Sequence, residues 1–167
     1  MSTSNFIKTS FQGGGGGGPF DEGSQIPQIL ESRLVRVNFW SDSVLNGIQL
    51  EWENPRITGP VHGSTTNSFN SFTLSKGERI IALTGRAGNR IDTLTLITNT
   101  GRSISIGGNG GGPFQWAVDL TKYPNAALHH FIGRNGSQID ALQAIFVTEH
   151  GEAPSELTLE LEHSESN

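Results

Sequence analysis

Short runs in which apolar and polar residues alternate are the main structural signal in this chain. Four of them, rich in β-branched and aromatic residues, span residues 34–39, 47–52, 91–97 and 144–147. This alternation predicts β-strands with one buried face, and turn-forming residues bound each run. No window carries an apolar stripe at helical spacing over three turns, and the only helix-like piece is 123–128. The pattern therefore predicts an all-β fold of roughly twelve short strands, in three similar sheets around one core.

Glycine marks an internal repeat. The chain has 22 glycines, and the run at 13–18 with its following Pro-Phe recurs at 107–112, offset by 94 and identical at seven of eight positions. The segment 85–94, a Gly-Arg-x-Gly-x-x-Ile-Asp-x-Leu sequence, matches 133–142 at six of ten positions with an offset of 48. These offsets are two periods and one period of about 47 residues, which predicts a threefold-repeated architecture.

The phase of the repeat pairs the two kinds of motif. Asp92 precedes the second glycine run by 15 residues. If three periods close into a ring of about 142 residues, counting 15 residues on from Asp140 leads back to residue 13, where the first glycine run begins. Spacing alone therefore pairs Asp140 with residues 13–18 and Asp92 with residues 107–112. The third copy falls in the turns 41–47 and 61–66, where the glycines and the aspartate are largely lost.

An aspartate beside a glycine loop suits hydroxyl groups. Glycine lets the main chain approach a ligand with its N–H groups exposed, and an ionised carboxylate supplies two acceptor oxygens. Neighbouring sugar hydroxyls both donate and accept, so they fit this combination. The alternative is that each Gly-x-x-x-Asp is an ordinary β-turn whose Asp bonds its own backbone. Two copies, each in phase with a glycine loop, favour the sugar-binding interpretation.

Other chemistries lack the residues that they need. Pro-Phe follows the glycine runs, in place of the Lys-Ser/Thr and helix of a phosphate-binding loop. The five histidines have no metal-ligand spacing, and His129 and His130 on one strand are expected to face opposite ways. No nucleophile motif is visible, and the two aspartates lie in different repeats, so we expect no enzyme activity, metal or cofactor. Trp40, Trp52 and Trp116 are expected to pack in the interior.

The motifs together resemble the jacalin-related lectins over residues 11–148. They are the glycine run ending in Gly-Gly-Pro-Phe, the two Gly-Arg-x-Gly-x-x-Ile-Asp-x-Leu loops and the hairpin 98–102, Thr-Asn-Thr-Gly-Arg. The resemblance implies a β-prism of three four-stranded sheets with pseudo-threefold symmetry, and a non-enzymatic lectin with shallow, metal-free pockets. The chain runs unbroken into the first glycine loop, so it is similar to the members that bind mannose or glucose.

The resemblance also implies which residues form two sites. The first comprises the Asp140 carboxylate and the backbone N–H groups of Ser137, Gln138 and Gly17. The second comprises the Asp92 carboxylate and the backbone N–H groups of Asn89, Arg90 and Gly111. Neither turn carries the aromatic residue that many relatives have there, and the third copy is expected to be empty.

Two alternative functions stay open from the sequence. Arg86, Arg90 and Arg134 lie beside the two sites and could favour sulfated or otherwise anionic glycans. The prism could also be a protein-interaction or toxin-like module that uses the acidic C-terminal segment.

Charge and the two ends of the chain set the remaining expectations. Six of the sixteen acidic residues lie after residue 148, which leaves ten acids against eleven bases in residues 1–148, and no basic field for nucleic acid. We expect an N-terminal extension (1–10), a lectin domain (11–148) and an acidic extension (149–167) with one possible extra strand. Glycans and a second copy of the chain, as a homo-oligomer such as a dimer, are the expected partners, without membrane insertion.

The expected location is cytoplasmic, with unconventional export as an option. The chain has no cysteine, and its first ten residues lack the pattern of a secretion signal. Asn135-Gly136-Ser137 is a glycosylation sequence within the first expected site, where an attached glycan would obstruct the pocket.

Overall fold

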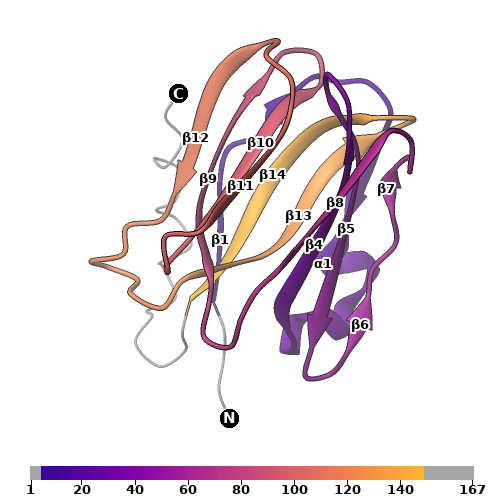
Figure 1. Cartoon of the computed structure of the whole chain (residues 1–167). Helices are drawn as coiled ribbons and strands as arrows, with labels where there is room; N and C mark the ends of the chain where they lie inside the picture. Colours follow the sequence, from indigo (N-terminus) through magenta and orange to yellow (C-terminus); the bar gives the residue numbers. More distant parts are fainter. Residues whose placement is uncertain (1–4, 149–167) are drawn as a thin grey trace.

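A computed structural model describes residues 5–148 as three antiparallel β-sheets (Figure 1). Sheet A has the order β1 (Asn5–Lys8), β14 (Ile139–Thr148), β13 (Ala127–Asn135) and β3 (Gly18–Asp21), with β2 (Gln12–Gly13) also paired to β14. Sheet B has the order β6 (Ile57–Thr58), β5 (Leu45–Glu53), β4 (Arg33–Ser41) and β8 (Ser68–Thr73), with β7 (His62–Gly63) also paired to β5. Sheet C has the order β11 (Ser103–Gly107), β10 (Ile91–Thr98), β9 (Ile80–Ala87) and β12 (Gly112–Ala117).

The three sheets share one plan, which confirms the all-β, three-sheet prediction. Each contains a hairpin of two long strands, β13–β14, β9–β10 or β4–β5, and a shorter strand beside it: β3, β12 or β8. In Figure 1 the turns of these hairpins lie toward the upper end of the molecule. β1 pairs with β14, so sheet A includes residues before position 11. The extra strand expected in residues 149–167 lies outside the described residues.

The core is filled from all three sheets. Trp52 of sheet B, Trp116 of sheet C and Phe131 of sheet A are fully buried, and each buried aromatic side chain contributes on the order of 2–3 kcal/mol. The Trp52 indole N–H donates to the His129 carbonyl oxygen at 2.8 Å and so joins two sheets. Trp40 is half-buried and packs against Phe69, with ring centroids 5.1 Å apart.

Two short helical segments were not expected from the sequence. They are α1 (Glu22–Gln25) and a 3₁₀ turn, η1 (Pro27–Glu31). The Asp21 side chain caps α1 by accepting a hydrogen bond from the Ser24 N–H at 3.3 Å. Neither is long enough to give a helical periodicity in the sequence. Among residues 5–148, no helix could cross a membrane by its length and apolar character.

The short helix-like piece at 123–128 forms no helix in the structure. Ala127 and Leu128 begin β13 and pair with Val147 and Phe146, so sheet pairing overrides the local preference.

The expectation that His129 and His130 face opposite ways is also wrong. The register of β13 against β14 shifts between Leu128 and His130, and both imidazoles are buried, with their Nδ1 atoms 2.7 Å apart. Burial lowers the pKa of His129, and burial together with the repulsion that a protonated His130 would meet from His129 and Lys8 lowers the pKa of His130 to about 3. Both rings are therefore neutral at physiological pH. A neutral imidazole has one N–H. If His129 Nε2 donates to the Ser32 carbonyl oxygen at 3.0 Å, His129 Nδ1 is an acceptor, and His130 Nδ1–H donates to it.

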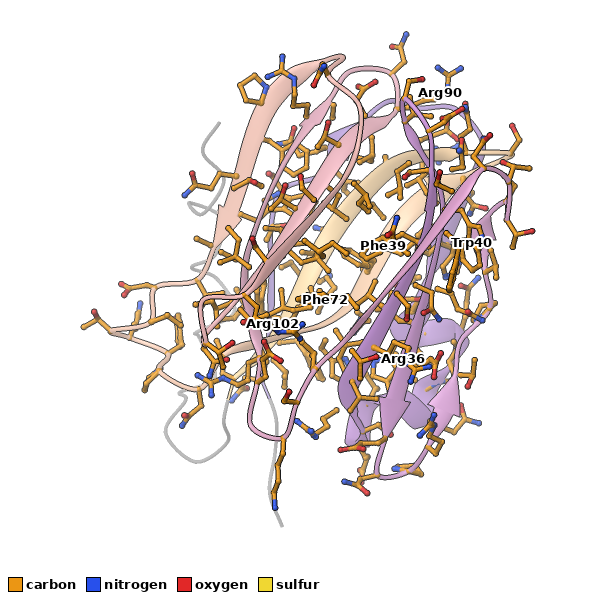
Figure 2. The ribbon with its side chains drawn as sticks, viewed as in Figure 1. Arg36, Phe39, Trp40, Phe72, Arg90 and Arg102 are labelled. Carbon is orange, nitrogen blue, oxygen red and sulfur yellow. The ribbon has the colours of Figure 1, made fainter. Side chains whose placement is uncertain are left out.

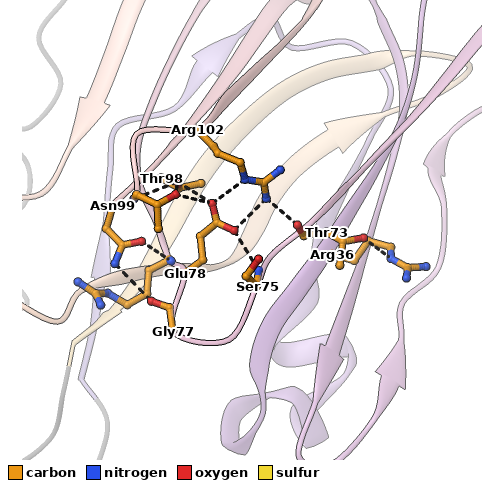
Figure 3. A network of polar contacts seen from close by, with 10 residues as sticks. Arg36, Thr73, Ser75, Gly77, Glu78, Thr98, Asn99 and Arg102 are labelled. Atoms are coloured by element: carbon orange, nitrogen blue, oxygen red, sulfur yellow. Dashed lines mark hydrogen bonds and ion pairs between the residues drawn. The ribbon is translucent and has the colours of Figure 1, made fainter.

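A buried carboxylate ties the turn after β8 to the β10–β11 hairpin (Figure 3). Glu78 accepts two hydrogen bonds from Arg102, at 2.9 and 2.8 Å, and one each from the hydroxyls of Thr98 and Thr100 and the Ser75 N–H. The Arg102 hydrogen bonds hold the pKa of Glu78 well below its usual range, although burial opposes this. The Thr-Asn-Thr-Gly-Arg hairpin singled out in the sequence therefore has a structural role.

We predict that Glu78→Gln lowers the free energy of unfolding by about 2 kcal/mol at neutral pH, because Arg102 loses its charged acceptor. The value is moderate because the Arg102 side chain is 48% exposed and solvent screens its charge. The folded-state pKa is lower than the ordinary value of 4.5. The stabilisation is thus complete above about pH 4.5 and is lost as the pH falls toward the folded pKa.

Urea unfolding of wild type and Glu78→Gln across a pH series measures this difference. It should shrink below pH 4.5, whereas Glu53→Gln, in a more exposed ion pair, should change stability by at most about 1 kcal/mol. A difference that is the same at every pH would contradict the assignment.

Candidate functional site

Three equivalent turns join the paired long strands of the three sheets. They span residues 135–140 in sheet A, 87–92 in sheet C and 41–46 in sheet B. Each turn contains the same backbone hydrogen bond: Gly136 N–H to the Gln138 carbonyl at 3.1 Å, Gly88 to Arg90 at 3.0 Å, and Asp42 to Val44 at 3.0 Å. The third copy is therefore conserved in backbone geometry, at the position that the repeat period indicated.

A loop docks on each turn through a second repeated hydrogen bond. Gly14 N–H donates to the Asp140 carbonyl, Gly108 to Asp92, and Ser64 to Asn46, each at 2.9 Å. We call the loops the first (13–18), second (107–112) and third (63–68) loops. Each has two residues with positive φ, four positions apart: Gly13 and Gly17, Gly107 and Gly111, and Gly63 and Asn67.

The sequence predicted loops near 41–47 and 61–66 but missed the correspondence of Asn67 with Gly17. Asparagine is one of the few residues other than glycine that adopts positive φ readily. This tolerance is the signal that could have identified the third loop.

At the first expected site the 13–18 loop lies beside Asp140, the pairing that the repeat phase predicted. A Cβ atom added at Gly16 would lie 3.1 Å from Asp140 Oδ1, and one at Gly17 would lie 2.7 Å from Oδ2, so the loop backbone passes directly beside the carboxylate. Asp140 is half-buried, and within residues 5–148 its carboxylate has no hydrogen-bond or ion-pair partner. The N–H groups of Ser137, Gln138 and Gly17 likewise have no acceptor in the described part of the chain.

The second expected site repeats this geometry. Added Cβ atoms at Gly110 and Gly111 would lie 2.9 Å from Asp92 Oδ1 and 2.6 Å from Oδ2. The Asp92 carboxylate and the N–H groups of Asn89, Arg90 and Gly111 are also without partners among the residues described. One difference is the Thr93 hydroxyl, which donates to the Gly108 carbonyl, whereas alanine occupies the equivalent position 141.

Two arginines hold the loops in place. Arg134 donates from Nε to the Gly16 carbonyl at 3.1 Å and from an Nη atom to the Gly17 carbonyl at 2.8 Å. Arg86 makes the same contacts with Gly110 at 3.1 Å and Gly111 at 2.7 Å. These hydrogen bonds occupy the loop carbonyls of Gly16, Gly17, Gly110 and Gly111 and fix the loops beside the two carboxylates. The sequence raised both arginines as candidates for anion binding, and the structure adds this loop-fixing contact; Arg90 is exposed.

The third copy replaces the free carboxylate with an internal network. Asn46 stands where the other copies have aspartate, and it is buried with its Nδ2 atom 3.2 Å from Asp42 Oδ1. The Asp42 carboxylate also accepts from the Asn67 amide and the Val44 N–H, both at 3.2 Å. Trp40 occupies the place of Arg134. The acceptor oxygens are already in use, in contrast to the other two copies.

The three copies interlock at one end of the prism. A Cβ atom on Gly14 of the first loop would lie 2.6 Å from the Asn89 carbonyl oxygen of the second site, and one on Gly108 would lie 2.5 Å from the Ser43 carbonyl oxygen. The third loop closes the ring, because Gly63 N–H donates to the Asn135 side-chain oxygen at 3.0 Å. Each loop thus contacts a neighbouring copy. Within residues 5–148, no group of three or more His, Asp or Glu side chains could hold a metal ion.

The three antiparallel sheets define a β-prism, and at one end of it glycine loops lie beside the carboxylates of Asp140 and Asp92. The chain belongs to the family described as Jacalin-like lectin domain, which matches residues 9–145. Proteins of this family bind carbohydrate without catalysing a reaction.

Relatives and solved structures agree with this assignment. Human zymogen granule membrane protein 16 is 31% identical over 131 residues, which cover 78% of this chain and 74% of the relative. Malaysian banana lectin superposes with a TM-score of 0.72 at 25% identity, covering 87% of this chain and 100% of that one. A mannose-binding jacalin-related lectin from Ananas comosus has the same fold, with a TM-score of 0.73 at 23% identity, over 86% of this chain and 98% of its own.

The expectation of a cytoplasmic location is wrong. The curated relatives from human, rat and mouse are all named zymogen granule membrane proteins, which points to a secretory or membrane-associated location. The absence of cysteine carries no information here, because the three-sheet core is assembled without disulfides. The Asn135 side chain, which begins the glycosylation sequence, is also engaged by Gly63.

We predict that Gly17→Ala destabilises the protein and Gly15→Ala does not, although both add one methyl group to the same loop. At Gly17, φ is +67° and the new Cβ would lie 2.5 Å from Asn135 backbone atoms and 2.7 Å from the Asp140 carboxylate. We expect a loss of about 2 kcal/mol in the free energy of unfolding and a distorted first site. At Gly15 nothing lies within 4 Å, so stability should stay within about 0.5 kcal/mol.

Thermal unfolding and the amide NMR shifts of Ser137 and Gln138 measure both effects. Equal stability of the two variants would contradict the described packing of this loop.

Proposed function

We propose that this protein is a lectin that recognises mannose- or glucose-type glycans at two metal-independent sites per chain. Asp140 belongs to the first site and Asp92 to the second. The observation that supports this most directly is the pairing, in both copies, of a carboxylate and backbone N–H groups that have no hydrogen-bond partner in the described part of the chain. Such groups need hydrogen-bond partners from water or from a ligand.

A sugar supplies both kinds of partner at once. Two neighbouring hydroxyls donate to the carboxylate oxygens, while their own oxygens accept from the N–H groups of Ser137, Gln138 and Gly17 in the first site. The second site uses Asn89, Arg90 and Gly111 in the same way. A neutral polyol balances every group without adding a buried charge, and hydrogen bonds to a charged acceptor are worth about 1.5–3 kcal/mol each.

The preference for mannose-type glycans is part of the proposal. The chain continues without a break from β1 into the first loop, a feature of the mannose group that the sequence resembles. The lectin from Ananas comosus, which has the same fold, is described as mannose-binding. The relatives named for zymogen granule membranes support a role in the secretory pathway or at a membrane surface.

Two shallow sites imply that multivalency matters more than the affinity of one site. A few hydrogen bonds on a solvated sugar give an affinity of roughly 1 mM, or about −4 kcal/mol. Two sites on one rigid body, or four in the homodimer that we also propose, raise the avidity by about 10²–10⁴ against a branched glycan.

We predict that Asp140→Asn and Asp92→Asn each silence one site, because an amide replaces one acceptor oxygen with a donor and removes the charge. Each substitution should halve the stoichiometry of methyl mannoside binding, and the double variant should bind none. Isothermal titration calorimetry and NMR titration measure this, and the two sites can be followed separately through the Gln138 and Arg90 amides.

Asp42→Asn is the matched control, since it lies in the equivalent turn of the third copy, where we propose no sugar site. It should keep both sites, although its own turn loses part of its network. Full mannoside binding by the folded double variant would refute the proposed sites, and binding of another sugar at the same amides would refute only the mannose preference.

A further inference from the structure

A pocket that differs chemically from the two proposed sugar sites lies at the end of sheet B away from the three turns. It has a volume of about 500 Å³ and opens between the start of β4, the ends of β5 and β8, and the turns that follow them. Figure 2 shows Arg36, near this pocket, toward the opposite end of the molecule from Arg90 of the second site. The charged residues that line it are Arg33, Arg36, Arg56, Lys76, Glu51 and Glu53.

The pocket concentrates positive charge in a protein that is negative as a whole. Four of the eleven lysines and arginines line it, against two carboxylates, which gives a local charge of +2 in a chain of net charge −5. A cluster of guanidinium groups around a concave surface raises the local concentration of anions.

Three of these four basic side chains are mostly exposed or form only weak ion pairs. Arg33 contacts Glu53 at 2.9 Å through Nε, with side chains 41% and 36% exposed, and Arg56 contacts Glu51 at 3.4 Å while 65% exposed. The exposed Arg33–Glu53 pair contributes at most about 1 kcal/mol, so an entering anion can replace it. The Arg56 side chain is itself mostly exposed, although its partner Glu51 is buried. Lys76 is exposed and has no ion-pair partner among the described residues.

One carboxylate is fixed more firmly and keeps the arginines in position. Glu51 is buried, and its Oε2 accepts from the Asn38 amide at 3.0 Å and lies 3.7 Å from an Nη atom of Arg36. The Arg36 Nε atom also donates to the Thr73 hydroxyl at 3.0 Å. Hydrogen bonds therefore hold Arg36 and Glu51 in place within the pocket. The more exposed side chains of Arg33, Arg56 and Lys76 can turn toward a bound anion.

We propose that this pocket binds a phosphate monoester. Such a group carries a charge of about −1.5 to −2 at neutral pH, which matches the local excess, and guanidinium forks bind its oxygens in pairs. The volume is at the lower part of the range for small-molecule sites, about 300–1,000 Å³, so it accommodates the organic group as well as the phosphate. The phosphate could belong to a soluble metabolite or to a lipid headgroup, since the chemistry is the same.

The position of the pocket allows both poles of the prism to be occupied together. Strand β4 begins at the pocket with Arg33 and ends at the third turn with Ser41. Nine residues of extended chain span roughly 30 Å, so a bound phosphate leaves the two glycan sites open. The protein could then connect a neutral glycan at one end to a phosphorylated molecule or surface at the other.

The test uses two probes that share a phosphate monoester: glycerol phosphate in solution, and vesicles of phosphatidylcholine with and without phosphatidic acid. We expect glycerol phosphate to shift the NMR signals of Arg33, Arg56 and Lys76. Arg56→Gln and Lys76→Gln should each weaken binding about tenfold, the loss of one charge-assisted hydrogen bond. Glu53→Gln should strengthen it, because it removes a competing carboxylate.

Lys8→Gln is the matched control, since it removes the same charge from an exposed position on β1. Binding of both probes, or only of vesicles that contain phosphatidic acid, supports the proposal, and the second result identifies the headgroup as the source. Equal weakening by Lys8→Gln and Arg56→Gln, or no binding of either probe, overturns it. The Asp140→Asn/Asp92→Asn double variant should bind both probes normally, so this proposal and the glycan proposal fail separately.

Discussion

The structure of the site end depends on one backbone contact, the hydrogen bond from each loop to the turn that it covers. Gly14, Gly108 and Ser64 donate to the carbonyls of Asp140, Asp92 and Asn46 at the same distance in all three copies. The residue before each donor has a positive φ, and a Cβ there would overlap the carbonyl that accepts the bond. Glycine is needed at that position because the two main chains touch, and this contact brings the backbone of the loop beside the side chain of the turn.

The same backbone arrangement is combined with two different hydrogen-bonding states of the carboxylate. In two copies the side chain beside the loop is an aspartate with no partner among residues 5–148, and Arg134 or Arg86 donates to the loop carbonyls. In the third copy Asn46 and Asn67 both donate to Asp42, which satisfies the carboxylate internally. Backbone geometry and binding chemistry are therefore separable: the hydrogen bond between loop and turn survives in a copy that has lost its free acceptor.

The sequence predicted the architecture well because its strongest signal was a repeat. The period gave three sheets, and its phase paired Asp92 with the loop that begins 15 residues later and Asp140 with a loop near the start of the chain. Details that depend on one residue were missed. The bulge at His129 turns two neighbouring side chains to the same side, and nothing in local alternation reveals an extra residue in one strand. Asn67 replaces a positive-φ glycine, and the contacts of Arg134 depend on the folded position of a loop 117 residues away.

The cyclic contacts between copies hold the two proposed sites in a fixed position relative to each other. The first loop touches the turn of the second site at Asn89, the second loop touches the turn of the third copy at Ser43, and the third loop is bound to Asn135 in the first. Each site is therefore braced by a neighbour, and its backbone donors are held in place before a ligand arrives. Prior ordering reduces the conformational entropy lost on binding. It also fixes the spacing of the two carboxylates, so the geometry of a branched ligand, more than the identity of its terminal sugar, should decide which glycans engage both sites at once.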